Sequence, residues 1–473
     1  MICRTKEIEI PQDNPFLNCK LQREAYAIIL TKVISQLEEG GVLSICGEWG
    51  TGKTTFVKMW EQQLKNQNFQ TLYFNVWEHD FMSDPLIGII TQFRKLVPND
   101  GAKQKLAEIS KSFMTIVTGM APKIAKVIAT HYIGAEAAEA IEAGMSKASD
   151  SFDAILNKFE EQSNSINEFK DSLRNYVDLV SPDKPIIFIV DELDRCNPHY
   201  AVKTLERIKH LFNIPGIIFV LSIDKEQLCN SIKGYFGSEQ LDAKEYLKRF
   251  IDFEYQLPKP TLKRYCQYLY GLYGFDQFFE SEQRKNYSIQ SNEREDFLQM
   301  AVTLYSCMNI NLRQIEKQFT HLRIAIQSFR ADKYVHPDVI VLLEYFRQKH
   351  YDFYNRMYHK QYTIDELVER LEEYLPNTLL SYDGSHDAQA HSFMLGVSKL
   401  ICCYAEDDIN RSHAIKLVTE GNESKLLFKC NIFNQEHLLR FIKFYTERAP
   451  FQGIFDIRVL MDHLELLNDF IVN

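Results

Sequence analysis

Eight consecutive residues have the composition and spacing of a loop that binds phosphate groups. Gly47-Glu48-Trp49-Gly50-Thr51-Gly52-Lys53-Thr54 fits the pattern G-x-x-x-x-G-K-[ST], between an expected strand and an expected helix. Glycines let backbone N–H groups point toward a phosphate, and the start of the helix adds positive potential. We expect Lys53 to reach the outer phosphates of a nucleoside triphosphate and the Thr54 hydroxyl to bind Mg²⁺. The expected nucleotide contacts are Gly47, Glu48, Trp49, Gly50, Thr51, Gly52, Lys53, Thr54 and Thr55.

Two adjacent acids supply the second half of such a site. Asp191-Glu192 follows directly after the apolar run 186–190. A carboxylate at the tip of a parallel strand lies at the edge of the sheet where phosphates bind. We expect Asp191 to bind Mg²⁺ together with Thr54, and Glu192 to orient or deprotonate a water. With Lys53, these residues would form machinery for hydrolysis.

A third acid, Asp224, ends the apolar run 217–223. At this position a polar side chain can sense the γ-phosphate through a water, so we assign Asp224 to catalysis with Glu192 and Lys53. The alternative is that Asp224 caps the helix that begins at Lys225. Asp194 has an equal claim to a structural and to a functional role.

Several arginines could add positive charge to the site. Arg313 is a candidate to fold back on the phosphates from a distant helix, although it could also lie on a solvated helix face. Arg195, Arg207 and Arg249 are candidates for an arginine finger that acts across a subunit boundary. The sequence does not choose among these three.

The elements that must position these residues follow from runs of apolar side chains. Strands are expected over 42–46, 71–76, 186–190 and 217–223, and helices over 24–37 and 54–64. The β-branched runs without alternation are typical of parallel strands that are covered on both faces. Strands that alternate with helices predict an α/β fold with a doubly wound sheet.

The length of 473 residues predicts more than one domain. We expect a leading segment and helix over 1–40, a nucleotide-binding core over 41–260, a helical lid over 261–332 and an all-α C-terminal domain over 333–473. Lys53 and Asp191 are 138 residues apart, far more than one strand–helix–strand unit needs, so a helical arm is expected at about 101–170. Its apolar stretches are too short for a transmembrane span, which leaves a solvated arm, an interfacial helix or an oligomer contact.

The composition of the chain bears on its binding partners and on its cellular compartment. The 54 basic and 64 acidic residues give a net charge of −10, so a general affinity for nucleic acid is not indicated. The 10 cysteines include no C-x-x-C pair, and no signal peptide precedes the first motif, which predicts reduced thiols in a cytoplasmic protein.

Taken together, these motifs resemble the KAP family of P-loop NTPases, relatives of the AAA+ and STAND proteins, over about 13–260. The resemblance rests on the Glu-Trp inside the phosphate loop, Phe74-Asn75-Val76-Trp77 with Asp84-Pro85-Leu86, Asp191-Glu192-Leu193-Asp194-Arg195-Cys196, Val220-Leu221-Ser222-Ile223-Asp224, and Tyr246-Leu247-Lys248-Arg249-Phe250 to Leu257-Pro258. Family members usually carry an insertion at this place, often with transmembrane helices, and more often have Asp where Glu192 stands. The chain is similar to the soluble bacterial members, which are linked with defence against phage beside a separate effector.

The resemblance implies ATP as the nucleotide. The resulting hypothesis is a Mg²⁺-dependent ATPase switch that forms a homo-oligomer and controls a partner effector, with the antiviral role of the bacterial group. One alternative is a nucleotide-bound oligomeric scaffold with little turnover. A second is that the C-terminal domain itself acts on nucleic acid.

Overall fold

The computed structural model describes residues 8–37, 39–82, 84–96, 109, 152–285, 292–308, 310–331, 335–381, 388–406, 417–418, 425–452 and 456–469. It divides into two compact units, Lys6–Lys259 and Pro260–Asn473, which we call the sheet unit and the helical unit.

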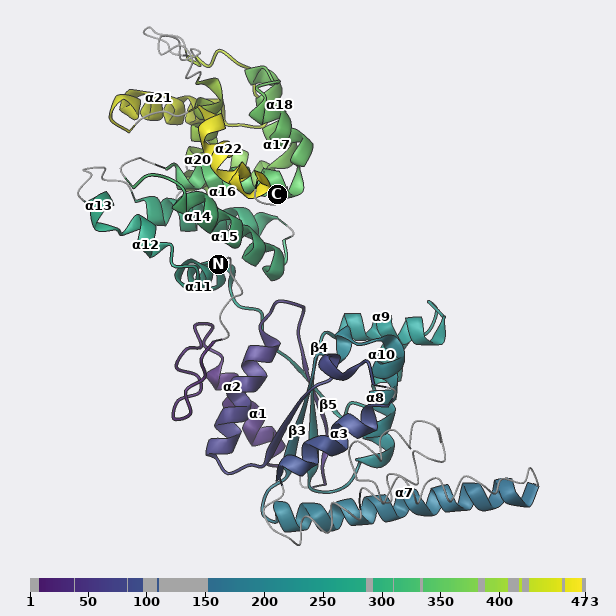
Figure 1. Ribbon diagram of the computed structural model, residues 1–473. Coiled ribbons are helices and arrows are strands. Elements are labelled where there is room, and N and C mark those ends of the chain that lie inside the picture. Colours follow the sequence, from purple (N-terminus) through teal and green to yellow (C-terminus); the bar gives the residue numbers. More distant parts are fainter. Residues whose placement is uncertain are drawn as a thin grey trace. The chain divides into compact units, whose positions relative to one another are not determined.

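The sheet unit is built on five parallel strands in the order β2-β3-β4-β1-β5 (Figure 1). The four expected strands are present within a residue or two of their predicted ends. The fifth, β5, was not predicted, because three of its four residues are exposed at the sheet edge and form no apolar run. The strands are β1 (Gly41–Cys46), β2 (Thr71–Asn75), β3 (Ile186–Asp191), β4 (Ile217–Ile223) and β5 (Phe253–Gln256).

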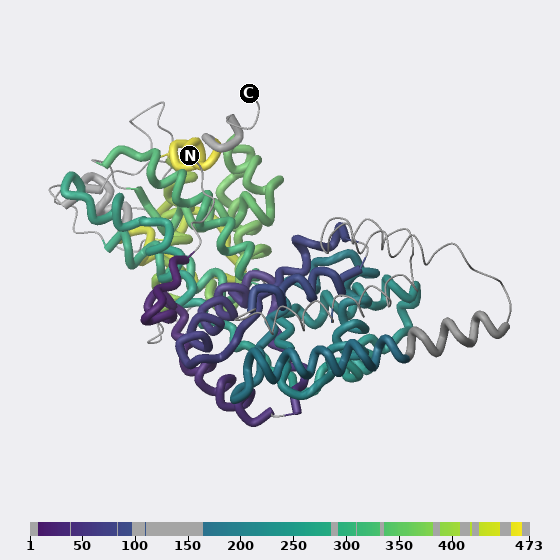
Figure 2. The backbone as a smooth tube through the Cα atoms, turned by 60° about the horizontal axis from the view of Figure 1, so that its bottom comes forward, coloured from purple at the N-terminus to yellow at the C-terminus, as the bar shows by residue number. Residues whose placement is uncertain are grey.

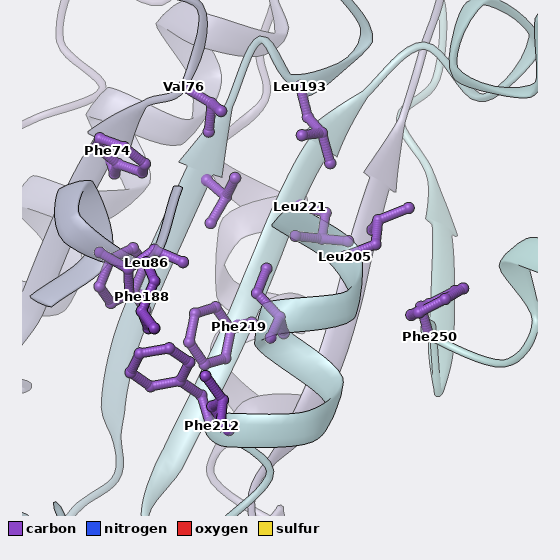
Figure 3. Close-up of a cluster of buried hydrophobic side chains, with 14 of the residues drawn as sticks. Phe74, Val76, Leu86, Phe188, Leu193, Leu205, Phe212, Phe219, Leu221 and Phe250 are labelled. Carbon is purple, nitrogen blue, oxygen red and sulfur yellow. The ribbon is translucent and has the colours of Figure 1, made fainter. Parts of the chain in front are cut away.

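Both faces of the sheet are buried, which explains why the central strands are apolar throughout. Phe188 and Phe219 lie opposite each other on β3 and β4, with ring centroids 5.0 Å apart, in the larger of two apolar clusters (Figure 3). Ile189 and Val220, one residue further along each strand, belong to the smaller cluster on the other face. This alternation decides the direction in which each strand-end side chain points.

Helices cover the two faces unequally. α1 and α2 cover the face of the smaller cluster, while α3, α7, α8 and α9 cover the other (Figure 1). Asn197 caps α8, and Pro198 occupies the first turn of this helix. The helices of this unit are α1 (Glu24–Ile34), α2 (Lys53–Asn66), η1 (Trp77–His79), α3 (Pro85–Phe93), η2 (Arg94–Leu96), α7 (Phe152–Val180), η4 (Leu193–Arg195), α8 (Pro198–Leu211), α9 (Lys225–Phe236) and α10 (Ala243–Leu247).

The expected helical arm at about 101–170 lies largely outside the described residues. The structure shows its C-terminal portion as part of α7, a helix of 29 residues that leads back to the sheet unit (Figures 1 and 2). Phe169 and Tyr176 anchor the end of α7 in the core, and the Tyr176 hydroxyl donates to the Phe93 carbonyl at 2.6 Å. The role of the arm stays a prediction.

The described part of the helical unit consists of helices and one isolated bridge, Val418–Leu426. α14 packs on both α16 and α20, so helices from before and after residue 332 share one core. Thr363 and Glu366 form a capping box, in which each side chain accepts the backbone N–H of the other residue. No described helix is long and apolar enough to cross a membrane. The helices are α11 (Leu262–Leu272), α12 (Asp276–Phe279), α13 (Glu282–Lys285), α14 (Glu293–Cys307), α15 (Leu312–Gln327), α16 (Pro337–Lys349), α17 (Tyr351–Tyr358), α18 (Ile364–Tyr374), α19 (Asn377–Leu380), α20 (Ala388–Ala405), α21 (Gln435–Gln452) and α22 (Ile457–Asp469).

Candidate functional site

The phosphate loop connects β1 to α2. The Gly47 N–H donates to the carbonyl of Ile223 at 3.1 Å, which holds the start of the loop against the end of β4. Gly50 and Gly52 have φ angles of +84° and +79°, in a region of backbone conformation that residues with a Cβ rarely adopt. Gly52 then caps α2, so the free N–H groups of the first turn of this helix lie beside the loop. This is the backbone arrangement that binds an anion.

Lys53, the first residue of α2, is 9% exposed. Its ammonium donates to the carbonyls of Gly47 at 2.6 Å and Glu48 at 3.2 Å, which closes the loop around its own lysine. Burial lowers the pKa of Lys53, and the nearby carboxylates of Asp194, Asp224 and Asp191 oppose that shift. Thr54 and Thr55 follow and are half-buried.

Two acids hold the loop from the sheet side through Trp49. The backbone N–H of Trp49 donates to Asp224 Oδ2 at 3.1 Å, and its indole N–H donates to Asp194 Oδ2. Asp224 also accepts from the backbone N–H groups of Glu226 and Gln227 through Oδ1, so it caps α9 and supports the loop at once. Burial raises the pKa of Asp194, an effect that the Trp49 hydrogen bond opposes.

Asp191 ends β3 on the face that α2 covers. Val190, the preceding residue, belongs to the larger cluster, so the Asp191 side chain points to the opposite face of the sheet. Asp191 is 1% exposed. Oδ2 accepts from the Tyr73 hydroxyl at 2.8 Å and Oδ1 from the Glu192 N–H at 3.0 Å. Burial and the Asp191 carboxylate raise the pKa of Tyr73, so this hydroxyl remains a donor. Tyr73 was not among the predicted site residues, and only its place near the end of a strand could have indicated it.

Ser222 lies within the motif 220–224 but was not among the predicted site residues. It pairs in register with Asp191 on one side and Ile45 on the other. Its side chain is fully buried, and its hydroxyl has no hydrogen-bond partner among the described residues. A buried hydroxyl without a partner is costly, so this one calls for an explanation. The signal in the sequence is one polar residue inside the apolar run of β4.

Glu192 begins the turn after β3 with a φ of +62°, an uncommon conformation for a residue with a Cβ. Its carboxylate accepts from Asn75 Nδ2 at 3.2 Å and forms an ion pair with Arg195 at 2.8 Å. Burial raises the pKa of Glu192, while Arg195 lowers it and Asp191 raises it further. The guanidinium of Arg195 also lies 5.6 Å from the ring centre of Trp77. Strain at an acid that other side chains hold in place is typical of a functional residue.

The other predicted arginines have different surroundings. Arg207 on α8 pairs with Asp84 at 2.7 Å, which joins α8 to the start of α3. Arg249 is exposed, with its guanidinium 5.9 Å from the ring centre of Tyr246. Arg313 is the second residue of α15 in the helical unit. Their assignments as arginine fingers or nucleotide contact stay predictions.

Comparison with known proteins agrees with this arrangement. The KAP family P-loop domain matches residues 23–328. A phage T7 exclusion protein of Escherichia coli is 23% identical over 240 residues, which is 47% of this chain and 31% of that protein. The chain therefore spans about a third of the length of this relative. Because the family domain matches well over half of the chain, including the phosphate loop, Asp191 and Glu192, the protein belongs to the KAP family of P-loop NTPases.

Proposed function

We propose that the protein is an ATPase switch that uses Mg²⁺, forms an oligomer and controls a partner effector in defence against phage. The observation that carries the catalytic part is the position of Asp191. It lies on the face of the sheet that α2 covers, and its charge acts on Lys53 at the start of that helix. A phosphate-binding helix start and a buried acid at the end of a neighbouring strand are the two halves that phosphoryl transfer needs.

Each residue has a distinct task in this proposal. The loop amides and Lys53 bind the β- and γ-phosphates, and the Lys53 ammonium, which has three donors, uses two of them on the loop carbonyls. Glu192 orients the attacking water and accepts its proton, for which a raised pKa is favourable. The hydroxyl of Ser222 and the carboxylate of Asp224 lie at the end of β4, the strand next to β1. We assign them to sensing the outer phosphate.

The residues present also fit Mg²⁺. The buried Asp191 carboxylate keeps lone pairs beyond the two that accept from Tyr73 and Glu192, and Thr54 contributes a hydroxyl from the first turn of α2. Oxygen ligands of this kind are what Mg²⁺ prefers. Bound Mg²⁺ would neutralise charge on the phosphates.

The proposed biological role has separate support. The relative from Escherichia coli is named for the exclusion of a phage, and the matched region covers only part of that protein. A switch that consumes ATP needs a component that responds to it, and we assign this response to a separate effector. The helical lid, the arm and the exposed Arg249 are the proposed routes by which subunits and effector sense the nucleotide.

Titration calorimetry on the full chain tests the nucleotide site. We expect heat on adding ATP with Mg²⁺, and an affinity about 10–100-fold lower for Lys53→Met, because a charge-assisted contact to the phosphates is lost. Lys65→Met on the same helix is the matched control, since the Lys65 side chain is about half exposed and forms an ion pair with Glu61 at 2.7 Å. Absence of heat with the wild-type chain, or equal affinity in Lys53→Met, would contradict the proposal. Light scattering with and without ATP tests the oligomer.

A further inference from the structure

Arg23 is a buried cation that the proposed chemistry does not use. It caps the N-terminus of α1 and is 3% exposed. Among the described residues it forms no ion pair with a carboxylate. Burial lowers the pKa of its guanidinium, and the groups that oppose this are Cys19, Tyr26 and Tyr255 rather than an acid. Keeping an arginine in such a place is costly, because a buried charge is normally paired.

The two recorded hydrogen bonds of Arg23 go to backbone carbonyls from distant parts of the sequence. Nη1 donates to the Gly52 carbonyl at 3.2 Å, and Nη2 donates to the Pro258 carbonyl at 3.4 Å. Gly52 is the cap of α2, and its carbonyl also accepts the N–H of Phe56. A Cβ at Gly52 would lie 3.2 Å from Nη1, so the loop and the guanidinium are closely fitted.

Pro258 belongs to a short segment that leads into the helical unit. The sheet unit ends at Lys259 and the helical unit begins at Pro260. Two further contacts join this segment to the phosphate loop or its strand. The Leu257 N–H donates to the Cys46 carbonyl at 2.8 Å, and Lys259 forms an ion pair with Glu48. The ion pair is more than half exposed, so it contributes little, and the buried contacts of Leu257 and Arg23 dominate.

We propose that Arg23 is a positioning residue that couples nucleotide binding at the phosphate loop to the segment 257–259 before the helical unit. The planar guanidinium presents N–H groups in two directions at fixed geometry, so a shift of the Gly52 carbonyl is passed to the Pro258 carbonyl. This inference rests on the proposed nucleotide binding. It adds the contacts through which nucleotide binding at the phosphate loop would affect the segment 257–259. Coupling is reciprocal, so loosening the segment must also weaken nucleotide affinity, and couplings of this kind are about fivefold or more.

Amide hydrogen exchange on the full chain, with and without ATP and Mg²⁺, tests the proposal. In the wild type we expect nucleotide to slow exchange in peptides that cover 47–55 and in peptides that cover 256–262. In Arg23→Gln at saturating ATP, the first protection should remain and the second should disappear. Lys32→Gln is the matched control, because Lys32 is exposed on the same helix and makes the same change in charge. It should behave as wild type.

The possible outcomes distinguish a failure of the coupling from a failure of the proposed nucleotide binding. Protection of 47–55 without protection of 256–262 in the wild type would overturn the coupling and leave nucleotide binding intact, as would unchanged protection of 256–262 in Arg23→Gln. No protection of 47–55 in the wild type would overturn both. If Arg23→Gln does not fold, Arg23→Lys replaces it, because a single ammonium keeps the charge but lacks the fork that reaches both carbonyls. The same loss at 256–262 is then expected, and its absence would count against the proposal.

Discussion

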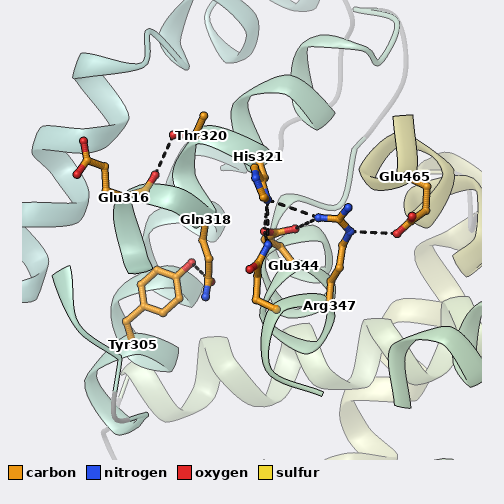
Figure 4. Close-up of polar contacts among 9 residues, drawn as sticks. Tyr305, Glu316, Gln318, Thr320, His321, Glu344, Arg347 and Glu465 are labelled. Carbon is orange, nitrogen blue, oxygen red and sulfur yellow. Dashed lines mark hydrogen bonds and ion pairs between the residues drawn. The ribbon is translucent and has the colours of Figure 1, made fainter. Parts of the chain in front are cut away.

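Most buried acids of the helical unit have a different kind of partner from the acids at the strand ends of the sheet unit. In the helical unit most of them pair with cations: Arg284 pairs with Glu293, and Lys399 with Asp338 at 2.7 Å, while Arg347 pairs with the half-buried Glu465 at 3.0 Å. Figure 4 shows the third of these pairs, where Arg347 lies between Glu465 of α22 and Glu344 of α16. Charge is neutralised within each group, as expected where a polar group joins packed helices. The buried Glu372 is an exception, because it accepts from the backbone N–H groups of 431–433.

In the sheet unit, three buried acids at or just beyond the ends of the strands accept instead from neutral donors, whereas the neighbouring Glu192 pairs with Arg195. Asp191 has a tyrosine hydroxyl, Asp194 an indole N–H and Asp224 three backbone N–H groups. Among the described residues, none of these three acids forms an ion pair, and Lys53 is the cation that acts on all three. Negative charge is thus held in place without being neutralised. At the strand ends, charge that is fixed by neutral donors therefore remains available to a cation or a proton, whereas the paired charges of the helical unit serve the packing of its helices.

The largest effect is expected for Glu192→Gln, which removes the proposed base. Turnover of ATP should fall about 10²–10⁴-fold, the usual contribution of general-base catalysis, while ATP affinity is maintained. Initial rates of phosphate release and calorimetry measure the two quantities. Glu78→Gln is the matched control, because exposed Glu78 accepts from the same Asn75 amide.

A different result would change the conclusion in a defined way. If wild-type turnover is already negligible and oligomer assembly is the same in Glu192→Gln, the chain is a nucleotide-bound scaffold. Equal, substantial turnover in both proteins would show that Glu192 is not the base.

Two buried lysines give the most direct test of the comparison. Lys399→Met should lower the free energy of unfolding by about 3–5 kcal/mol, because it leaves Asp338 and Asp296 without their cation. Lys53→Met should lower it less, because its acids keep their neutral donors, and should act on nucleotide affinity instead. Urea unfolding measures the first quantity, with exposed Lys349→Met as the control in the helical unit. Equal destabilisation by Lys53→Met and Lys399→Met would break the distinction between the units.

Local signals predicted much of the fold. The apolar runs of β1, β3 and β4 carry enough information because these strands are buried on both faces. The caps at Asn197 and Thr363 were also predictable, since each depends on neighbours within three residues. β5 was missed because an exposed edge strand leaves no periodic pattern, and the order of the strands follows from packing that no local segment contains.

For the candidate site too, the contiguous motifs were predictable from the sequence and the long-range contacts were not. The phosphate loop and Asp191-Glu192 are contiguous motifs. The contact between Trp49 and Asp194 joins residues 145 positions apart, and the Arg23 contact with Pro258 spans 235. Such contacts depend on how the loops close over the sheet edge. Ser222 looked like an ordinary strand residue until its register with Asp191 was known.

A smaller effect is expected from pH in the helical unit. Burial raises the pKa of Asp296 to about 6; Lys399 opposes the shift, and Asp338 and Glu293 add to it. The folded protein therefore binds this proton more tightly than the unfolded chain, whose aspartates titrate near pH ~4. The stabilising contribution is complete below that value and is lost as the pH rises through about 6. Asp296→Asn should remove this loss, so its melting temperature should rise relative to wild type between pH ~4 and ~7.

The control for the pH series is Glu295→Gln, on the exposed side of the same helix. It should follow the wild-type curve. A constant difference between Asp296→Asn and wild type at every pH would mean that Asp296 titrates alike in both states.

The smallest effects concern two helix caps, one in each unit. Thr363→Ala removes the hydroxyl that accepts the Glu366 N–H and should cost about 1 kcal/mol of unfolding free energy, with nucleotide affinity unchanged. Asp224→Ala removes a cap of similar worth from α9, but it also releases the Trp49 N–H of the phosphate loop. We therefore expect a similar thermal shift in both variants and weaker ATP binding in Asp224→Ala only. If calorimetry gives the same ATP affinity for both variants, Asp224 acts only as the cap of α9. Asp191 and Asp194 are then the acids at the sheet edge that act on the nucleotide site.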